Sequence, residues 1–172
     1  MTAGEEEPFM LEQILQAMLE LSRGNLHDID HFLKVWAYAR SIGRLEGLDD
    51  ETQLTLEIAA LVHDIACPLC REKYGNTAGR HQEREGGPMA EAFLAPFGLP
   101  RRVRDRVRWL VEHHHTFTDI QGQDYQILVE ADYLVNAGES GYARTAIERF
   151  RDQYFRTGSG KAMLDAVYLR QA

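Results

Sequence analysis

The sequence predicts an all-α fold, a compact helical bundle of about seven or eight helices. Apolar residues recur at helical spacing along almost the whole chain, and no repeat or long linker interrupts them. The length of 172 residues fits one domain, since domains commonly hold about 100 to 200 residues. Hydrophobic residues make up 44% and charged residues 27% of the chain, which is typical of a globular protein. We therefore expect residues 1–172 to fold as a single domain.

The first half of the chain predicts three helices, at residues 8–21, about 28–42 and about 49–66. Pro8 is tolerated in the first turn of the opening helix. The second helix can be capped by Asp28 or Asp30, and His31 lies on its apolar stripe. The third contains an apolar run that leads directly into the pair His63-Asp64. Two of these helices therefore direct polar side chains toward the interior.

The second half begins with a predicted loop at residues 67–80, because turn-forming residues are frequent there. Further helices are expected from residue 82 or 88 to 97, from about 100 to 114, around 128–135, at 143–154, and in a short C-terminal segment ending near 170. One apolar stripe continues to His114, and another places Asp132 among aliphatic residues. The core of the domain is expected at about 27–140, with helix 8–21 and the helices of 143–170 packed on it.

Charge and hydropathy exclude two classes of partner. The chain carries 19 basic and 27 acidic residues, a net charge of −8, which repels extended nucleic acid. The longest apolar run, Ile58–Val62, is far shorter than the roughly 20 residues of a membrane span. The acidic start Glu5-Glu6-Glu7 has the wrong charge for a signal peptide, and two cysteines suit a reducing compartment. We expect a cytoplasmic protein.

Two local motifs have alternative interpretations. The segment Arg101–Arg108 carries five arginines and one aspartate, and it forms either a solvated helix face or an anion-attracting rim for a phosphorylated ligand. Cys67 and Cys70 form a C-x-x-C motif. We expect structural thiols there, and the alternative is an auxiliary zinc site with His63 or His81.

Interior histidines and aspartates predict a metal site. His31, His63, Asp64 and Asp132 come from separate segments whose neighbours are apolar. A buried carboxylate without a partner costs several kcal/mol, so these aspartates need a proton, a hydrogen-bonding partner or a cation. A mixed set of imidazole and carboxylate groups suits a first-row divalent metal. Metal binding therefore explains the pattern better than a series of hydrogen-bonded core residues.

These residues also carry a resemblance. The segment from His31 to Val35, the pair His63-Asp64 and the segment Glu130-Ala131-Asp132 resemble, in order and spacing, the motifs of the HD superfamily of metal-dependent phosphohydrolases. The resemblance implies that His31, His63, Asp64 and Asp132 bind a catalytic divalent metal and that Asp64 can bridge to a second one. Lys34 matches a basic position of the family.

The second metal depends on less clear matches. His114 and His115 fit the place of late family histidines, while His81 and Glu85 compete for an earlier one. Glu85 lies closer to that place and would put a carboxylate where the family has an imidazole. A site with one metal and a site with two metals therefore both stay open, and we favour the site with one metal. The Gly-Tyr-Pro signature of cyclic-dinucleotide phosphodiesterases is missing after His115, which disfavours that subclass.

The predicted function is therefore a metal-dependent phosphohydrolase that cleaves a phosphate ester of a small phosphorylated compound, a nucleotide being one candidate, through a metal-activated water. The residues expected to take part in catalysis are Asp64, Lys34, Glu85 and His114. The metal would be a divalent transition metal, with Fe, Mn, Zn, Co and Ni not distinguished by the sequence and Mg as a further candidate. The alternative is a non-catalytic sensor module that binds a metal or a nucleotide in the same pocket.

Overall fold

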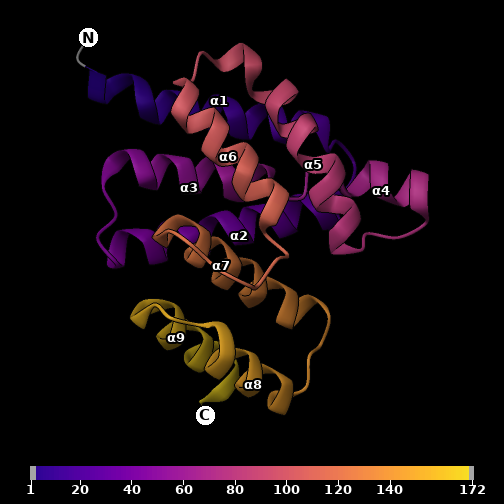
Figure 1. Ribbon diagram of the computed structural model, residues 1–172, viewed down its shortest axis with the longest axis vertical. Helices are drawn as coiled ribbons and strands as arrows, with labels where there is room; N and C mark the ends of the chain where they lie inside the picture. The colour runs from indigo at the N-terminus through magenta and orange to yellow at the C-terminus, as the bar shows by residue number, and fades with distance from the viewer. Residues whose placement is uncertain (1–2, 171–172) are drawn as a thin grey trace.

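The computed structural model describes residues 3–170, and the side chains of residues 9–170 (Figure 1). Within that range the chain consists of helices and their connections, without a strand. The helices are α1 (Ala3–Leu21), α2 (Leu26–Leu45), α3 (Asp50–Val62), α4 (Cys67–Tyr74), α5 (Gly79–Leu94), α6 (Arg101–His113), α7 (Gln123–Glu139), α8 (Arg144–Tyr154) and α9 (Gly158–Leu164). Short helical segments follow at Ala95–Phe97 and Asp165–Leu169. The all-α prediction is confirmed, and residues 1–2 and 171–172 of the expected domain lie outside the described residues.

The caps of α2 and α3 illustrate how local sequence starts a helix. Asp49 caps α3 as predicted, because its carboxylate accepts a hydrogen bond from the amide of Thr52 at 3.0 Å. The cap of α2 differs from the prediction, since Asn25 accepts from the amide of Asp28 at 3.2 Å. The helix therefore begins at Leu26, and Asp28 lies in its first turn. A carboxylate there interacts favourably with the positive end of the helix dipole.

The predicted loop at residues 67–80 is wrong over its first half, which forms α4. Pro68 lies in the first turn, where a proline needs no amide hydrogen bond. Gly75 ends the helix in the left-handed conformation, with a φ of 69°. The turn-forming residues thus mark the two ends of a short helix, and only the segment between α4 and α5 is a loop.

Helix α5 begins at Gly79 and continues through Pro88, so it contains both of the predicted starting points. Its contact with α6 depends on two adjacent glycines. A Cβ atom added at Gly86 would lie 2.7 Å from Cγ1 of Val111, and one added at Gly87 would overlap Glu112. The absence of these side chains therefore lets the two helices approach closely.

The core lies around α3, which is buried from Gln53 to Val62 except at Leu54. Helix α3 packs against α1, α2, α6 and α7. Figure 1 shows α2 and α3 across the middle of the molecule, α5 and α6 above them, and α7 below, with α8 and α9 beneath α7. Because α3 ends inside this packing, the His63-Asp64 pair that follows it lies at the centre of the protein.

One stretch, Asp50–Tyr74, is long and apolar enough to cross a membrane by length and composition. Its most apolar window is 78% buried inside the protein. It also comprises two helices, α3 and α4, joined by a turn. This is the pattern of core helices in a globular fold.

Candidate metal centre

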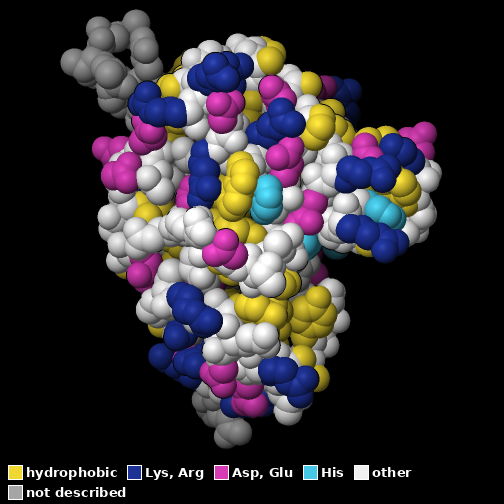
Figure 2. All heavy atoms as spheres, in the orientation of Figure 1, with side chains coloured by type: hydrophobic (Ala, Val, Ile, Leu, Met, Phe, Trp, Pro, Cys, Tyr) yellow, Lys and Arg dark blue, Asp and Glu magenta, His cyan; other side chains and the backbone are white. Residues whose placement is uncertain are grey.

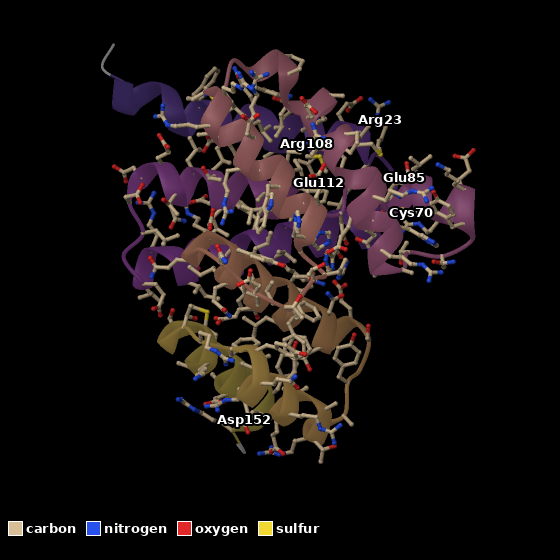
Figure 3. The ribbon with its side chains drawn as sticks, viewed as in Figure 1. Arg23, Cys70, Glu85, Arg108, Glu112 and Asp152 are labelled. Carbon is tan, nitrogen blue, oxygen red and sulfur yellow. The ribbon has the colours of Figure 1, made fainter. Side chains whose placement is uncertain are left out.

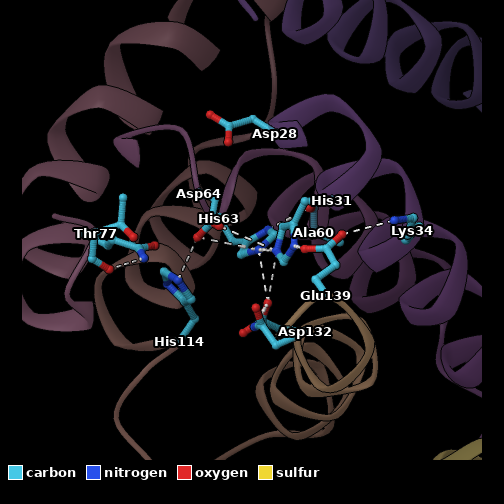
Figure 4. Close-up of polar contacts among 12 residues, drawn as sticks. Asp28, His31, Lys34, Ala60, His63, Asp64, Thr77, His114, Asp132 and Glu139 are labelled. Atoms are coloured by element: carbon cyan, nitrogen blue, oxygen red, sulfur yellow. Dashed lines mark hydrogen bonds and ion pairs between the residues drawn. The ribbon is translucent and has the colours of Figure 1, made fainter. Parts of the chain in front are cut away.

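Three histidines converge at the centre of the bundle (Figure 4). His31 comes from α2, whereas His63 and His114 immediately follow the ends of α3 and α6. Nδ1 of His63 lies 2.8 Å from the carbonyl oxygen of Ala60, and Nδ1 of His114 lies 2.8 Å from that of Val111. A carbonyl oxygen only accepts, so in each ring Nδ1 carries the proton. In the neutral rings Nε2 is then left with a lone pair directed into the cluster.

Asp64 and Asp132 face these nitrogens. Oδ1 of Asp132 lies 3.2 Å from Nε2 of His31 and 3.5 Å from Nε2 of His63. Oδ1 of Asp64 lies 3.6 Å from Nε2 of His63 and 3.3 Å from Nε2 of His114. The two imidazole nitrogens of His31 and His63 are themselves 3.2 Å apart. Five ligand-type groups from four segments of the chain therefore meet in one place.

The spacing and the unmet hydrogen bonds of this cluster fit a metal ion. Ligand atoms bound about 2.1 Å from one ion lie about 3.0 to 3.4 Å apart in octahedral or tetrahedral geometry, close to the separations observed here. Asp64 Oδ1 and His114 Nε2 are buried and have no hydrogen-bond partner among the described residues. Such atoms are costly unless something else, such as a cation, satisfies them. His31, His63 and Asp64 could hold one ion, and Asp64, His114 and His115 a second.

The electrostatics of the cluster favour positive charge. Burial by itself lowers the pKa of His31, but Asp132 and Asp64 raise it to about 10. Burial raises the pKa values of Asp64 and Asp132, yet the surrounding imidazoles hold both well below the ordinary range. The carboxylates thus remain ionised in the interior and require a compensating cation, either protons on the rings or a metal that replaces them.

The comparison with known families agrees with this geometry. Residues 28–137 match the HD domain family. The chain belongs to the HD family. The crystal structure of a predicted HD superfamily hydrolase from an uncultured Thermotogales bacterium is similar, with a TM-score of 0.66 and 26% sequence identity over 91% of this chain and 84% of that one. No curated protein matches the chain.

Glu139 is a part of this HD domain that the sequence did not single out. Its Oε2 lies 2.8 Å from Nδ1 of His31, and its Oε1 accepts a hydrogen bond from the Lys34 ammonium at 3.1 Å. Lys34 therefore connects to His31 only through Glu139, as Figure 4 shows. The spacing from Asp132 to Glu139, two turns along α7, was the available signal, but a glutamate at a helix end is usually solvated.

Two other predicted residues of the HD domain, Glu85 and His81, belong to neither of the groups that could hold a metal. Glu85 accepts hydrogen bonds from the Tyr74 hydroxyl at 2.5 Å and from Lys73 at 3.0 Å. These contacts lower its pKa to about 2. His81 stacks on the ring of Tyr74, with centroids 4.0 Å apart. Both side chains thus tie α5 to α4, and Figure 3 shows Glu85 beside Cys70 at that junction.

The two motifs with alternative interpretations also have a place in the HD domain. Cys67 and Cys70 are buried free thiols, and neither belongs to a described group that could hold a metal. Most arginines of the segment 101–108 are paired, with Arg102 on Glu51, Arg106 on Asp124 and Arg108 on Glu91 and Glu112. Figure 3 labels Arg108 and Glu112 on α6. Because acidic partners already neutralise these arginines and none of the five lines the cavity beside Asp132, the interpretation as a charged helix face fits better than the anion-attracting rim.

A cavity of about 560 Å³ adjoins the cluster, and Asp132 and His115 are among the residues that line it. Asn136 also lines the cavity, and its amide nitrogen donates to Oδ1 of Asp132 at 2.8 Å. His115 Nε2 is buried and has no hydrogen-bond partner in the described part of the chain. The candidate metal centre is therefore open to a small molecule on this side.

Proposed function

We propose that the protein is a metal-dependent phosphohydrolase that cleaves a phosphate ester of a small phosphorylated compound, with nucleotides among the candidates. The observation that carries the proposal is the meeting of three inward Nε2 atoms and two ionised aspartates, one of which, Asp132, lines a cavity. Family membership and the hydrolase description of the Thermotogales neighbour agree with it.

In this proposal His31, His63, Asp64 and Asp132 are the metal ligands. A divalent cation held by them would supply Lewis acidity toward a phosphoryl oxygen and lower the pKa of a water molecule. Asp132 would be held in its binding orientation by the hydrogen bond from Asn136. His31 would be oriented by Glu139, as second-sphere carboxylates commonly orient ligating histidines.

His114 and His115 would complete a second metal site or accept a proton during the reaction. Asp64 belongs to both groups that could hold a metal. It could therefore bind the first ion and also a second ion that His114 and His115 would hold. This second group has only one carboxylate, so we expect its ion to bind more weakly than the first. Burial and the neighbouring His114 lower the pKa of His115 to about 4, and its neutral Nε2 could accept a proton or a hydrogen bond at the cavity wall.

The two remaining predicted catalytic residues take supporting roles. Lys34 would hold the Glu139 carboxylate against His31, and Glu85 would join α4 to α5. Neither lines the cavity, so we do not assign them direct contact with substrate. The cytoplasmic location and the single domain over residues 1–172 stay predictions.

The test is hydrolysis of phosphomonoesters, phosphodiesters and nucleotides by protein reconstituted separately with Mn²⁺, Fe²⁺, Co²⁺, Zn²⁺, Ni²⁺ and Mg²⁺. We expect cleavage of a phosphate ester bond with at least one metal, measured by chromatography of the products, and loss of that cleavage in Asp64→Asn. Metal or nucleotide binding without hydrolysis of any of these compounds would contradict the proposal and favour the sensor module instead.

A further inference from the structure

The cavity beside Asp132 is lined mainly by α7 and α8, with Gln82 of α5 and residues of the neighbouring loops. Residues of α7 and α8 form its walls, and the loops before α5 and α7 close it with Thr77 and Phe117. Its volume of about 560 Å³ falls within the range of about 300 to 1,000 Å³ that is usual for small-ligand pockets. If a phosphate lies at the metal centre, as the proposed function requires, the rest of the substrate must occupy this space.

One stripe of α7 carries both the candidate metal ligand Asp132 and side chains that would contact the rest of the substrate. Asp132, Tyr133 and Asn136 all line the cavity, and they lie within about one helical turn, or about 5.4 Å of rise. Across the cavity, α8 contributes side chains at helical spacing, namely Ala146, Arg149, Phe150, Gln153 and Tyr154. A substrate bound through its phosphate near Asp132 would therefore bring its next atoms against the rings of Tyr133 and Phe150.

Aromatic rings dominate these walls. Tyr133 and Phe150 stack with centroids 3.6 Å apart and planes 5° apart, and the edge of Phe117 meets Phe150 at 5.4 Å. Tyr133 is only 9% exposed and forms the back of the wall. Phe117 and Phe150 are partly buried, and Tyr142 at the same cavity is 43% exposed, so this side of the wall is open. Figure 2 shows hydrophobic side chains gathered at the surface between α7 and α8. An open aromatic wall of this kind attracts a planar ring.

The charge of the cavity limits the number of phosphates. Arg149 is the one lysine or arginine among the described lining residues, and it makes no ion pair within the described part of the chain. Its neighbours on α8 differ, since Arg144 pairs with Glu148 and Arg151 with Asp165. One unpaired guanidinium in the cavity that Asp132 also lines suits one phosphate group. The further charges of a triphosphate would have no cation in the cavity and would meet a protein of net charge −8.

Amide groups supply polar contacts for the edge of a ring. Gln82 donates through Nε2 to the carbonyl oxygen of Thr77 at 2.8 Å, while its Oε1 is buried without a partner among the described residues. Gln82 and Gln153 both line the cavity. A ligand that carries ring N–H or amino groups could satisfy the Gln82 oxygen, whereas a purely hydrocarbon ring would leave it unpaired.

We propose that this cavity binds the base of a nucleoside monophosphate, with the aromatic wall of Tyr133 and Phe150 contacting the base and Arg149 contacting the phosphate. The inference rests on the proposed function for the position of the phosphate. It adds the substrate class, which is a monophosphate with a heteroaromatic base, as opposed to a polyphosphate or a sugar phosphate without a base.

The first experiment compares adenosine 5′-monophosphate, ribose 5-phosphate and adenosine triphosphate as substrates of the Mn²⁺-loaded protein. We expect kcat/KM for the monophosphate to exceed that for ribose 5-phosphate by about tenfold or more, the size that one base–aromatic contact commonly supplies. The triphosphate should also be the poorer substrate, through a higher KM. Equal values for the monophosphate and ribose 5-phosphate would overturn the inference.

Variants of the two walls separate the base from the phosphate. Phe150→Leu should lower the preference for the monophosphate over ribose 5-phosphate toward one. Arg149→Gln should raise KM for both monophosphates with little change in kcat. Arg144→Gln, on the same helix but outside the cavity, is the matched control and should change neither. If Phe150→Leu does not fold, as judged by its thermal melt, the half-exposed Tyr142→Leu replaces it with the same expected direction.

Binding of adenosine to the metal-free protein, measured by titration calorimetry, provides a readout that does not depend on activity. We expect adenosine to bind the wild type and Arg149→Gln equally, and to bind Phe150→Leu at least about tenfold more weakly. No adenosine binding, or binding unchanged by Phe150→Leu, would overturn the inference. If no phosphate ester is hydrolysed with any metal but adenosine binds as described, the proposed function fails while the assignment of the cavity stands.

Discussion

At the scale of single residues, the candidate centre depends on which atom accepts each Nδ1 proton. Ala60 and Val111 provide carbonyl oxygens from the helices that His63 and His114 terminate, so these two rings are oriented by their own helix ends. His31 lies inside a helix, where the carbonyls are used by the helix itself. It needs a side chain from elsewhere, and Glu139 provides it.

Metal content should depend on the central pair. We expect His63→Ala and Asp64→Ala each to lower the bound metal per chain at least tenfold, because each removes an atom that faces the proposed ion and leaves the other groups too few. Inductively coupled plasma mass spectrometry of reconstituted protein measures this. His27→Ala is the matched control, since His27 is exposed on the same helix as His31. Equal metal content in all three variants would contradict the proposed ligands.

Glu139 should matter for metal affinity more than for folding. Glu139→Ala removes the partner of His31 Nδ1 at 2.8 Å, and loss of such a partner commonly weakens metal binding by about 10- to 100-fold. Lys34→Ala leaves that contact in place, so a smaller effect is expected. Competition with a chromophoric chelator measures both affinities. Equal affinities of Glu139→Ala and the wild type would show that the carboxylate does not orient the ring.

At the scale of elements, the turn-forming residues had two possible effects. Pro68 and Gly75 are compatible with a loop and equally with the first turn and the end of a helix. Buried contacts of Cys67 and Cys70 favour the helix, and these contacts come from packing that local sequence does not reveal. In α5 the glycine pair Gly86-Gly87 lies inside the helix and permits the close contact with α6, a role that the local sequence does not reveal.

That contact can be tested in isolation. We expect Gly86→Ala to lower the free energy of unfolding by about 1 to 3 kcal/mol, because the new methyl group would lie 2.7 Å from Cγ1 of Val111 and force the helices apart. Urea denaturation followed by circular dichroism measures the change. Gly158→Ala is the control, since its methyl group would meet nothing closer than 3.8 Å. A stability of Gly86→Ala at or above that of the wild type would refute the close contact.

At the scale of the whole molecule, the centre joins segments that are far apart in the chain. His31 and Glu139 are separated by 108 positions, and the five central side chains come from α2, α7 and the ends of α3 and α6. A cation bound to all of them would connect these segments only in the folded state. Metal binding should therefore contribute to the stability of the entire fold.

Removal of the metal should accordingly lower the melting temperature. A ligand present at about 100 times its dissociation constant stabilises the folded state by about 2.7 kcal/mol, which corresponds to a shift of about 5 to 11 °C for a domain of this size. Differential scanning calorimetry with and without EDTA measures the shift, and His63→Ala provides the control that should not respond. An unchanged melt after proven loss of metal would indicate that no central ion connects the helices.

Sequence patterns alone were sufficient for the all-α class, for most helices, and for the resemblance based on His31, His63, Asp64 and Asp132. Helical periodicity is a local property, and a charged residue on an apolar stripe is visible without a structure. Those four side chains do meet at one place, although their role as ligands stays a proposal.

Only the tertiary structure decided which other polar residues join them. Glu85 was expected near the metal and instead contacts Tyr74 and Lys73, whereas Glu139 was not expected and contacts His31. The cavity could not be predicted from the sequence either, because its walls come from α7, α8 and loops that only the tertiary packing brings together. The physical reason is the same in each case: a side chain's partner is set by how helices pack, and packing joins residues whose separation along the chain carries no signal.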